Sequence, residues 1–221
     1  MDLLKALFLG NSYTYCNKLP WIVSELAKSA GKTLEVNMVT EGGVDFEWHF
    51  NNQETLKVIK ETAWDIVVLQ NHSMGAVKQR EKMHQYGLIL NGEIQKRGAQ
   101  AVFFMTWARQ HIPEMQKEIT EAYSDLAKEA GAKVAPVGIA WENALKADPD
   151  LILHTEDKSH PNPVGSYLAA CVFYSTFYQA SPEGLTGNIT VDGEKIVELQ
   201  DTNALSLQSI AWETVQGFKL D

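Results

Sequence analysis

The sequence is poor in cysteine, with only Cys16 and Cys171 among its 221 residues. Two thiols so far apart allow at most one bond, which excludes a fold held together by a disulfide framework. Long apolar runs are also missing, since none approaches the roughly 20 residues of a membrane-spanning helix. The apolar segment 1–10 is too short for a signal-peptide core with a cleavage site. We therefore expect a cytoplasmic protein without a membrane span, or a secreted one if a leader has been removed.

An excess of positive charge is absent as well. The chain carries 19 Lys and Arg against 28 Asp and Glu, a net charge of −9, and its isoelectric point is about 5.2. No cluster of basic residues interrupts this acidic balance, so the electrostatic footprint of a nucleic-acid-binding protein is missing. The expected partner is a small molecule or a carbohydrate. Nothing in the sequence indicates an oligomeric state.

Metal-ligand motifs are the last absence. Five of the six histidines have spacings that match no common zinc motif. We expect neither a metal nor an organic cofactor, although a metal-dependent hydrolase built on these side chains remains an alternative. The five residues are His49, His72, His84, His111 and His154.

Short apolar runs alternate with longer amphipathic segments along most of the chain. The apolar runs have almost no polar interior residues, which is typical of parallel strands covered on both faces. The segment 19–30 begins with Pro20 and ends before Gly31, a common pattern for a helix. The alternation predicts a three-layer α/β/α sandwich with a parallel sheet of about five strands. We expect strands at 5–9, 34–39, 65–70, 101–105 and 133–137, and helices at 19–30, 54–62, 80–97, 114–130 and 163–178.

The composition suits one domain. Apolar residues make up 45% and charged residues 21% of the chain, and 221 residues can bury a single core. No repeat or linker divides the sequence, so we expect one domain over 1–221. From about 181 it is less regular, with a hairpin at 189–197 and a final amphipathic segment at 204–217.

Chemically reactive residues follow the predicted strands. In open parallel sheets, ligands bind beyond the carboxyl ends of the strands. We therefore expect the polar segments after these strands to converge on one edge, together with a late polar segment. These segments are 10–14, 41–45, 70–73, 106–111 and 157–161.

Three residues of these segments form a candidate catalytic triad. A serine is a weak nucleophile and needs an adjacent base that a third group orients. Asp157 and His160 are three residues apart, a spacing that lets the carboxylate hold one imidazole nitrogen while the other faces Ser12. Read separately, Ser12 and Asp157 are more often helix caps and His160 an ordinary loop residue.

The negative intermediate of such a reaction needs hydrogen-bond donors. The backbone N–H groups of Ser12 and Gly43 are two candidates, and a side-chain amide of Gln70 or Asn71 is a third. Gly43 permits a close approach of the backbone to a substrate, although a turn with positive φ explains a glycine there equally well.

Four further residues are candidates for a polar, aromatic substrate pocket. Tryptophan faces stack on sugar rings, and arginine binds carboxylates. A core tryptophan and a surface arginine are the alternatives. The four residues are His49, His72, Trp107 and Arg109.

These segments, in this order, resemble the conserved blocks of the SGNH (GDSL-like) hydrolase superfamily over roughly 5–175. Segment 9–13 resembles the first block, with Asn11 in place of the usual Asp before Ser12. Gly42-Gly43 resembles the second block, whose Gly contributes an oxyanion N–H. Asp157-x-x-His160-Pro161 resembles the fifth block, whose Asp and His complete the triad.

The third block departs from the superfamily pattern Gly-x-Asn-Asp, because this chain has Gln70-Asn71-His72-Ser73. Strict register places His72 where the donor Asn is expected, and a shift by one residue places Asn71 there. The closest resemblance is to an uncharacterised bacterial subgroup related to carbohydrate acetylesterases.

The resemblance implies a flavodoxin-like SGNH hydrolase fold. It also implies a serine esterase that removes small acyl groups, with O-acetyl groups on a carbohydrate as the first choice of substrate. The alternatives are a short-chain lipid or thioester esterase and a non-catalytic carbohydrate-binding relative.

Overall fold

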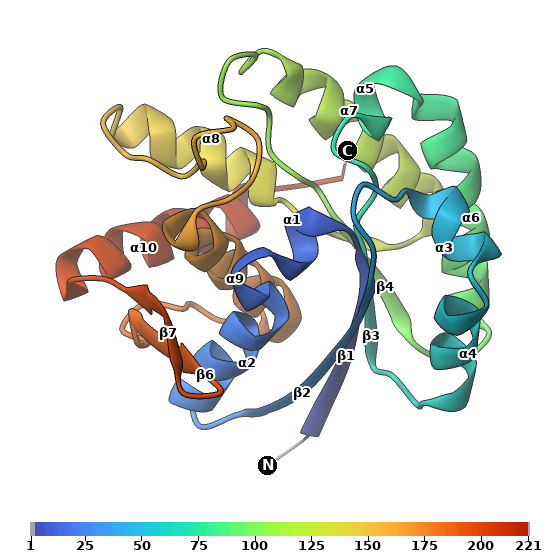
Figure 1. Cartoon of the computed structure of the whole chain (residues 1–221), viewed down its shortest axis with the longest axis horizontal. Helices are drawn as coiled ribbons and strands as arrows, with labels where there is room; N and C mark the ends of the chain where they lie inside the picture. The colour runs from blue at the N-terminus through green and yellow to red at the C-terminus, as the bar shows by residue number, and fades with distance from the viewer. Residues whose placement is uncertain (1–2, 221) are drawn as a thin grey trace.

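A parallel sheet of five strands forms the centre of the molecule (Figure 1). The structure is a computed structural model and describes residues 3–220. The strands follow the order β2-β1-β3-β4-β5, and every neighbouring pair is parallel. The α/β prediction of about five parallel strands is confirmed. The strands are β1 (Leu3–Gly10), β2 (Thr33–Thr40), β3 (Ile66–Leu69), β4 (Gln100–Phe104) and β5 (Lys133–Ala135).

Helices cover both faces of the sheet, which gives the predicted three layers (Figure 1). One face carries α2 (Leu19–Ser29), α8 (Val137–Ala147), α9 (Pro163–Tyr178) and α10 (Asp201–Gly217). The other carries α3 (Phe46–Asn51), α4 (Gln53–Glu61), α5 (Gly75–Lys78), α6 (Arg80–Gln95) and α7 (Met115–Ala130). The short α1 (Ser12–Tyr15) and a 3₁₀ turn, η1 (Cys16–Lys18), follow β1 directly. Within residues 3–220, no helix combines the length and the apolarity needed to cross a membrane.

Strand β1 joins the two halves of the core. Its side chains alternate in direction, so Ala6 and Phe8 belong to the apolar cluster of α2 and α9, whereas Leu7 and Leu9 belong to the cluster of α3, α6 and α7. All four are completely buried. This explains why the strand reads as one continuous apolar run rather than as an alternating pattern.

The structure differs from the sequence-based expectation most clearly at α8. The predicted strand 133–137 is shorter, because Pro136 ends β5 and the chain enters α8 at Val137. A proline cannot donate a ladder hydrogen bond, and a short apolar run does not by itself distinguish a strand from a buried helix.

The segment after residue 181 is more regular than expected. It forms the hairpin of β6 (Asn188–Val191) and β7 (Glu194–Glu198), followed by α10. Asp192 and Gly193 turn the hairpin with φ of 51° and 80°, the backbone that an Asp-Gly turn favours. Its buried residues join the same core as α2 and α9.

The strand order places a topological switch point between β1 and β3. The chain goes from β1 outward to β2 and then returns to the other side of β1. At such a point the loops leaving the two strands diverge and open a crevice at their carboxyl ends. The segments that begin at Gly10 and Gln70 therefore start side by side.

His49 lies inside the protein, so the prediction that it lines a substrate pocket is wrong. Its side chain is completely buried in α3, where Nε2 donates to the carbonyl oxygen of Gly10 (3.1 Å). Its Nδ1 lies 3.3 Å from the hydroxyl of Thr55. The histidine therefore ties α3 and α4 to the end of β1. Burial lowers the pKa of His49 from 6.5 to about 4.

We expect His49 to make the protein less stable at acidic pH. Between pH 6.5 and 4 the unfolded chain binds a proton at this position that the folded chain excludes, so stability falls as the pH is lowered. The loss between pH 7 and 4.5 should be about 2–3 kcal/mol. Urea unfolding of His49→Gln should show a decline that is smaller by this amount, and the exposed His111→Gln is the control. An equal decline in His49→Gln and wild type would contradict the prediction.

Two helix glycines give a matched test of packing. A Cβ at Gly165 in α9 would lie 2.5 Å from the carbonyl oxygen of Leu153 and 2.6 Å from the Trp141 ring, whereas one at Gly92 in α6 meets nothing within 4 Å. Gly165→Ala should lower the free energy of unfolding by about 1–3 kcal/mol through overpacking. Gly92→Ala should raise it by about 0.5–1 kcal/mol. Urea titrations measure the free energy of unfolding of both variants. If the two substitutions change it equally, α9 has room to shift and the packing argument is wrong.

Candidate active site

The carboxyl end of β1 is packed too closely for any residue but glycine. A Cβ on Gly10 would lie 2.2 Å from Oγ1 of Thr14 and 2.5 Å from Oε1 of Gln70. The Gln70 oxygen also accepts hydrogen bonds from the N–H of Asn11 (2.7 Å) and the hydroxyl of Thr14 (2.9 Å). The loops after β1 and β3 are thus held together directly below Ser12.

Asn11 connects three of the predicted segments. Its Oδ1 caps α1 by accepting from the N–H of Tyr13 (3.1 Å). Its Nδ2 donates to the carbonyl oxygens of Val44 (2.9 Å) and Asn71 (3.5 Å). An aspartate, the usual residue here in the resembling family, cannot donate, so the side chain of Asn11 supplies a link that a carboxylate lacks.

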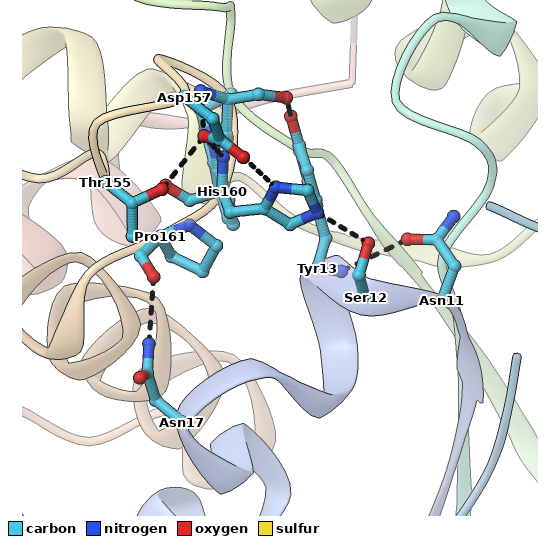
Figure 2. A network of polar contacts seen from close by, with 10 residues as sticks. Asn11, Ser12, Tyr13, Asn17, Thr155, Asp157, His160 and Pro161 are labelled. Carbon is cyan, nitrogen blue, oxygen red and sulfur yellow. Dashed lines mark hydrogen bonds and ion pairs between the residues drawn. The ribbon is translucent and has the colours of Figure 1, made fainter. Parts of the chain in front are cut away.

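Ser12, His160 and Asp157 form one hydrogen-bonded chain, although 148 residues separate the first two in sequence (Figure 2). The Ser12 hydroxyl lies 2.8 Å from Nε2 of His160. The other ring nitrogen, Nδ1, contacts Oδ2 of Asp157. Because an ionised carboxylate can only accept, Nδ1 carries the proton and Nε2 accepts from the serine. This is the arrangement that a serine nucleophile and its general base require.

Asp157 is held in its ionised form. Burial raises its pKa, but hydrogen bonds from the His160 side chain and from the N–H groups of His160 and Ser159 outweigh this effect. The hydroxyl of Thr155 adds another, at 2.9 Å. The pKa of Asp157 is therefore well below its ordinary value, and the carboxylate stays charged across the neutral range.

The loop that carries His160 is attached to the body by hydrogen bonds on both sides. The Trp107 indole donates to the carbonyl oxygen of Ser159 (3.0 Å), and the Tyr13 hydroxyl lies 2.6 Å from the Ser159 hydroxyl. The Asn17 amide donates to the carbonyl oxygen of Pro161 (2.9 Å; Figure 2). The imidazole is therefore positioned by groups from the loops after β1 and β4.

Trp107 lies in the middle of a ring stack. Its ring is parallel to Tyr13 at 4.6 Å on one side and to Trp141 at 4.0 Å on the other. Tyr13 in turn meets the ring of His160 edge-on at 5.5 Å. Both faces of Trp107 are covered, so the prediction that it offers a face to a sugar is wrong, and its role is to support the His160 loop.

Two backbone N–H groups, those of Ser12 and Gly43, are the predicted oxyanion donors, and each lies in a distinctive backbone position. Ser12 is the first residue of α1, so its N–H has no acceptor within that helix. Gly43 is exposed and has φ of 70°, a conformation that L side chains rarely adopt. Asn11, which precedes Ser12, donates to the carbonyl oxygen of Val44, the residue after Gly43. This hydrogen bond connects the glycine loop to the start of α1.

Of the two amide candidates, Gln70 has a structural role. It is completely buried, its oxygen holds the loop after β1, and its nitrogen donates to the carbonyl oxygen of Asn71. In Asn71 the oxygen accepts from the N–H of Phe46 (2.9 Å), which leaves the Nδ2 end as the free donor. This nitrogen lies over Gly75, where a Cβ would come within 2.2 Å of it. The Gln70 amide is therefore engaged at both ends, whereas the Asn71 amide is engaged at its oxygen.

The other two predicted pocket residues are His72 and Arg109, which are both partly exposed. His72 is partly exposed, and its Nδ1 accepts from the N–H of Met74 (3.2 Å). Burial and the charge of Arg109 lower the pKa of His72, against the opposing charge of Asp45. Both residues remain candidates for contact with a substrate.

Sequence reasoning missed several residues that support this site. Tyr13, Asn17 and Thr155 each hold the His160 loop or its carboxylate. Their types are common in loops, and no spacing marks them, so only the fold reveals their contacts. Within residues 3–220, no group of three or more His, Cys, Asp or Glu side chains is arranged to hold a metal.

Comparisons with known proteins were made by sequence and by structure. No family model and no curated protein matches the chain in sequence. The structure is similar to a protein from Slackia heliotrinireducens that is assigned to the SGNH hydrolases, with a TM-score of 0.71 and 27% identity. The match covers 80% of this chain and 100% of that one.

Two further solved structures share the fold at lower identity. A DUF4886 family protein from Bacteroides uniformis matches over 98% of this chain and 96% of its own, with a TM-score of 0.79 and 18% identity. The acetyl xylan esterase AlAXEase matches over 78% and 98%, with a TM-score of 0.65 and 20% identity. Esterases and GDSL-like proteins recur among the other matches. The chain therefore has the fold of the SGNH (GDSL-like) hydrolases.

Proposed function

We propose that this protein is a serine esterase in which Ser12 is the nucleophile, His160 the general base and Asp157 the residue that orients it. The observation that carries the proposal is the hydrogen-bonded chain from Ser12 through His160 to Asp157, at the carboxyl edge of the sheet. The similarity to structures described as esterases supports the same reaction class.

In the proposed reaction, Oγ of Ser12 attacks the ester carbonyl carbon while Nε2 of His160 takes the hydroxyl proton. The tetrahedral intermediate collapses, the bond to the alcohol breaks, and His160 returns the proton to the departing oxygen. Water then attacks the acyl-serine by the same route and releases the acid and free Ser12. Asp157 keeps the reactive imidazole tautomer and stabilises the imidazolium.

The carbonyl oxygen becomes negative during both attacks. We assign its stabilisation to the N–H groups of Ser12 and Gly43 and to the amide nitrogen of Asn71. The hydrogen bonds of Asn11 support this assignment, because they join the glycine loop and the Asn71 backbone to the start of α1. No step needs a metal or an organic cofactor.

An O-acetyl group on a carbohydrate is the proposed substrate. The side chains of His160 and Asp157 are 37% and 49% exposed, so the nucleophile lies in an open position that suits an ester carried on a larger molecule. The fold shared with an acetyl xylan esterase supports the same choice.

Replacing Ser12 tests the nucleophile. Ser12→Ala should lower kcat on 4-nitrophenyl acetate and on acetylated xylo-oligosaccharides by at least about 10³-fold, because water alone replaces the activated hydroxyl. A serine-directed phosphonate should inactivate the wild-type protein and increase its mass. The mass of the Ser12→Ala variant should not change. Undiminished activity of Ser12→Ala would eliminate the proposed mechanism. A wild-type protein that hydrolyses 4-nitrophenyl acetate but not the acetylated xylo-oligosaccharides would eliminate the carbohydrate assignment.

The third oxyanion donor can be identified with a pair of variants. Asn71→Ala should lower kcat on 4-nitrophenyl acetate by about 10²–10³-fold with little change in KM, because the lost hydrogen bond strengthens only in the transition state. His72→Ala is the matched variant for the alternative register. A large loss of kcat in His72→Ala with a small one in Asn71→Ala would assign the donor to His72.

A further inference from the structure

A cavity of about 220 Å³ lies beside the candidate site, between the segment after β4 and helix α8. Trp107, Arg109, Trp141 and His154 are among the residues that line it. His154 pairs across the chain with Pro161, the residue after the proposed base. The cavity therefore adjoins the loop that carries His160. None of the residues that line the cavity belongs to the proposed triad.

Two of its lining residues carry buried hydrogen-bond donors without partners. Across residues 3–220, only four buried side-chain N or O atoms have no hydrogen-bond partner, and two of them are Nε of Arg109 and Nε1 of Trp141. Both nitrogens can only donate. Leaving a buried donor unpaired costs about 1–3 kcal/mol, so both side chains are held beside the cavity at a cost. Because the two nitrogens themselves are shut off from solvent, the part of Arg109 that a ligand can reach is the outer end of its guanidinium.

The charges around the cavity leave one cation unbalanced. Lys146 is paired with Glu142 at 3.0 Å, and both line the cavity. Burial lowers the pKa of His154, which keeps it neutral at pH 7. Arg109 has no ion pair within the described part of the chain. In a protein of net charge −9, this guanidinium is an exception that favours an anion.

The same guanidinium is also close to the candidate site. Its charge lowers the pKa of His72, which burial lowers too, and it opposes the burial that raises the pKa of Tyr13. Tyr13 follows the proposed nucleophile and contacts the His160 ring. Arg109 therefore lines the cavity and also acts electrostatically on residues of the candidate site.

We propose that this cavity is a specificity subsite for a carboxylate on the ester substrate, with Arg109 as its cationic donor and the Trp141 ring as part of its wall. The inference rests on the proposed esterase function. About 220 Å³ admits a group of a few heavy atoms, which suits a carboxylate with a short stem. The carboxylate belongs either to the leaving alcohol or to the acyl group.

Matched ester pairs distinguish these two sources. The pair 4-acetoxybenzoate and methyl 4-acetoxybenzoate differs by a carboxylate in the leaving group, and mono-4-nitrophenyl succinate and 4-nitrophenyl butyrate differ by one in the acyl group. In one of the pairs, Arg109→Gln should reduce the ratio of kcat/KM for the charged ester over the neutral one by about 10–100-fold, the value of a charge-assisted hydrogen bond. Arg97→Gln, an exposed arginine near the opposite edge of the sheet, should leave both ratios unchanged. Unchanged ratios in Arg109→Gln for both pairs would overturn the proposal.

A binding measurement separates failure of the subsite from failure of the esterase. In Ser12→Ala, 4-hydroxybenzoate and succinate are titrated while the indole N–H resonances of the six tryptophans are followed by NMR. The Trp141 resonance, identified with Trp141→Phe, should shift saturably with at least one of the acids, and Arg109→Gln in the same background should abolish the shift. If the Trp141 resonance shifts but the wild-type protein hydrolyses no ester, the anion site is supported and the proposed esterase function is eliminated. No saturable shift with either acid would show that the cavity holds only water.

Discussion

The candidate site depends on one long-range contact, the meeting of the loop after β1 with the loop before α9. Three neighbouring interactions make this contact: Ser12 with His160, Tyr13 with Ser159, and Asn17 with Pro161. Closing a loop of about 150 residues costs little more entropy than closing a short one, because the cost grows only with the logarithm of length. The core packing of α9 against α2 therefore suffices to bring the two loops together.

Sequence reasoning located the strands well and selected residues that the fold brings together, for physical reasons. A central parallel strand is apolar on both faces, so β1 and β3 are visible as continuous apolar runs. Asp157 and His160 are visible because their contact is local, within one turn. The sequence does not identify the third donor, because the roles of Gln70, Asn71 and His72 depend on which amide already binds the loop after β1. Trp107 was misjudged because stacking partners 34 and 94 residues away, Trp141 and Tyr13, cannot be seen from composition.

Asn11 shows how one atom changes the logic of the site. With an amide instead of a carboxylate, this position both caps α1 and donates to the second loop, so it needs no separate cation to balance it. Gln70 then completes the arrangement from below by accepting from the N–H of Asn11. Ser12 thus follows a neutral hydrogen-bonded network, and the ionised carboxylate of the proposed triad is that of Asp157.

The alternation of β1 between the two halves of the core has a mechanical consequence. Leu7 and Leu9 belong to one apolar layer and Ala6 and Phe8 to the other, on a strand that ends two residues before the proposed nucleophile, Ser12. Separating the helices from either face of the sheet would expose half of the β1 side chains to solvent. It would also weaken the packing of β1 against the opposite layer. The two layers are thereby coupled as a single cooperative unit, and Ser12, the proposed nucleophile, loses its support whichever layer opens first.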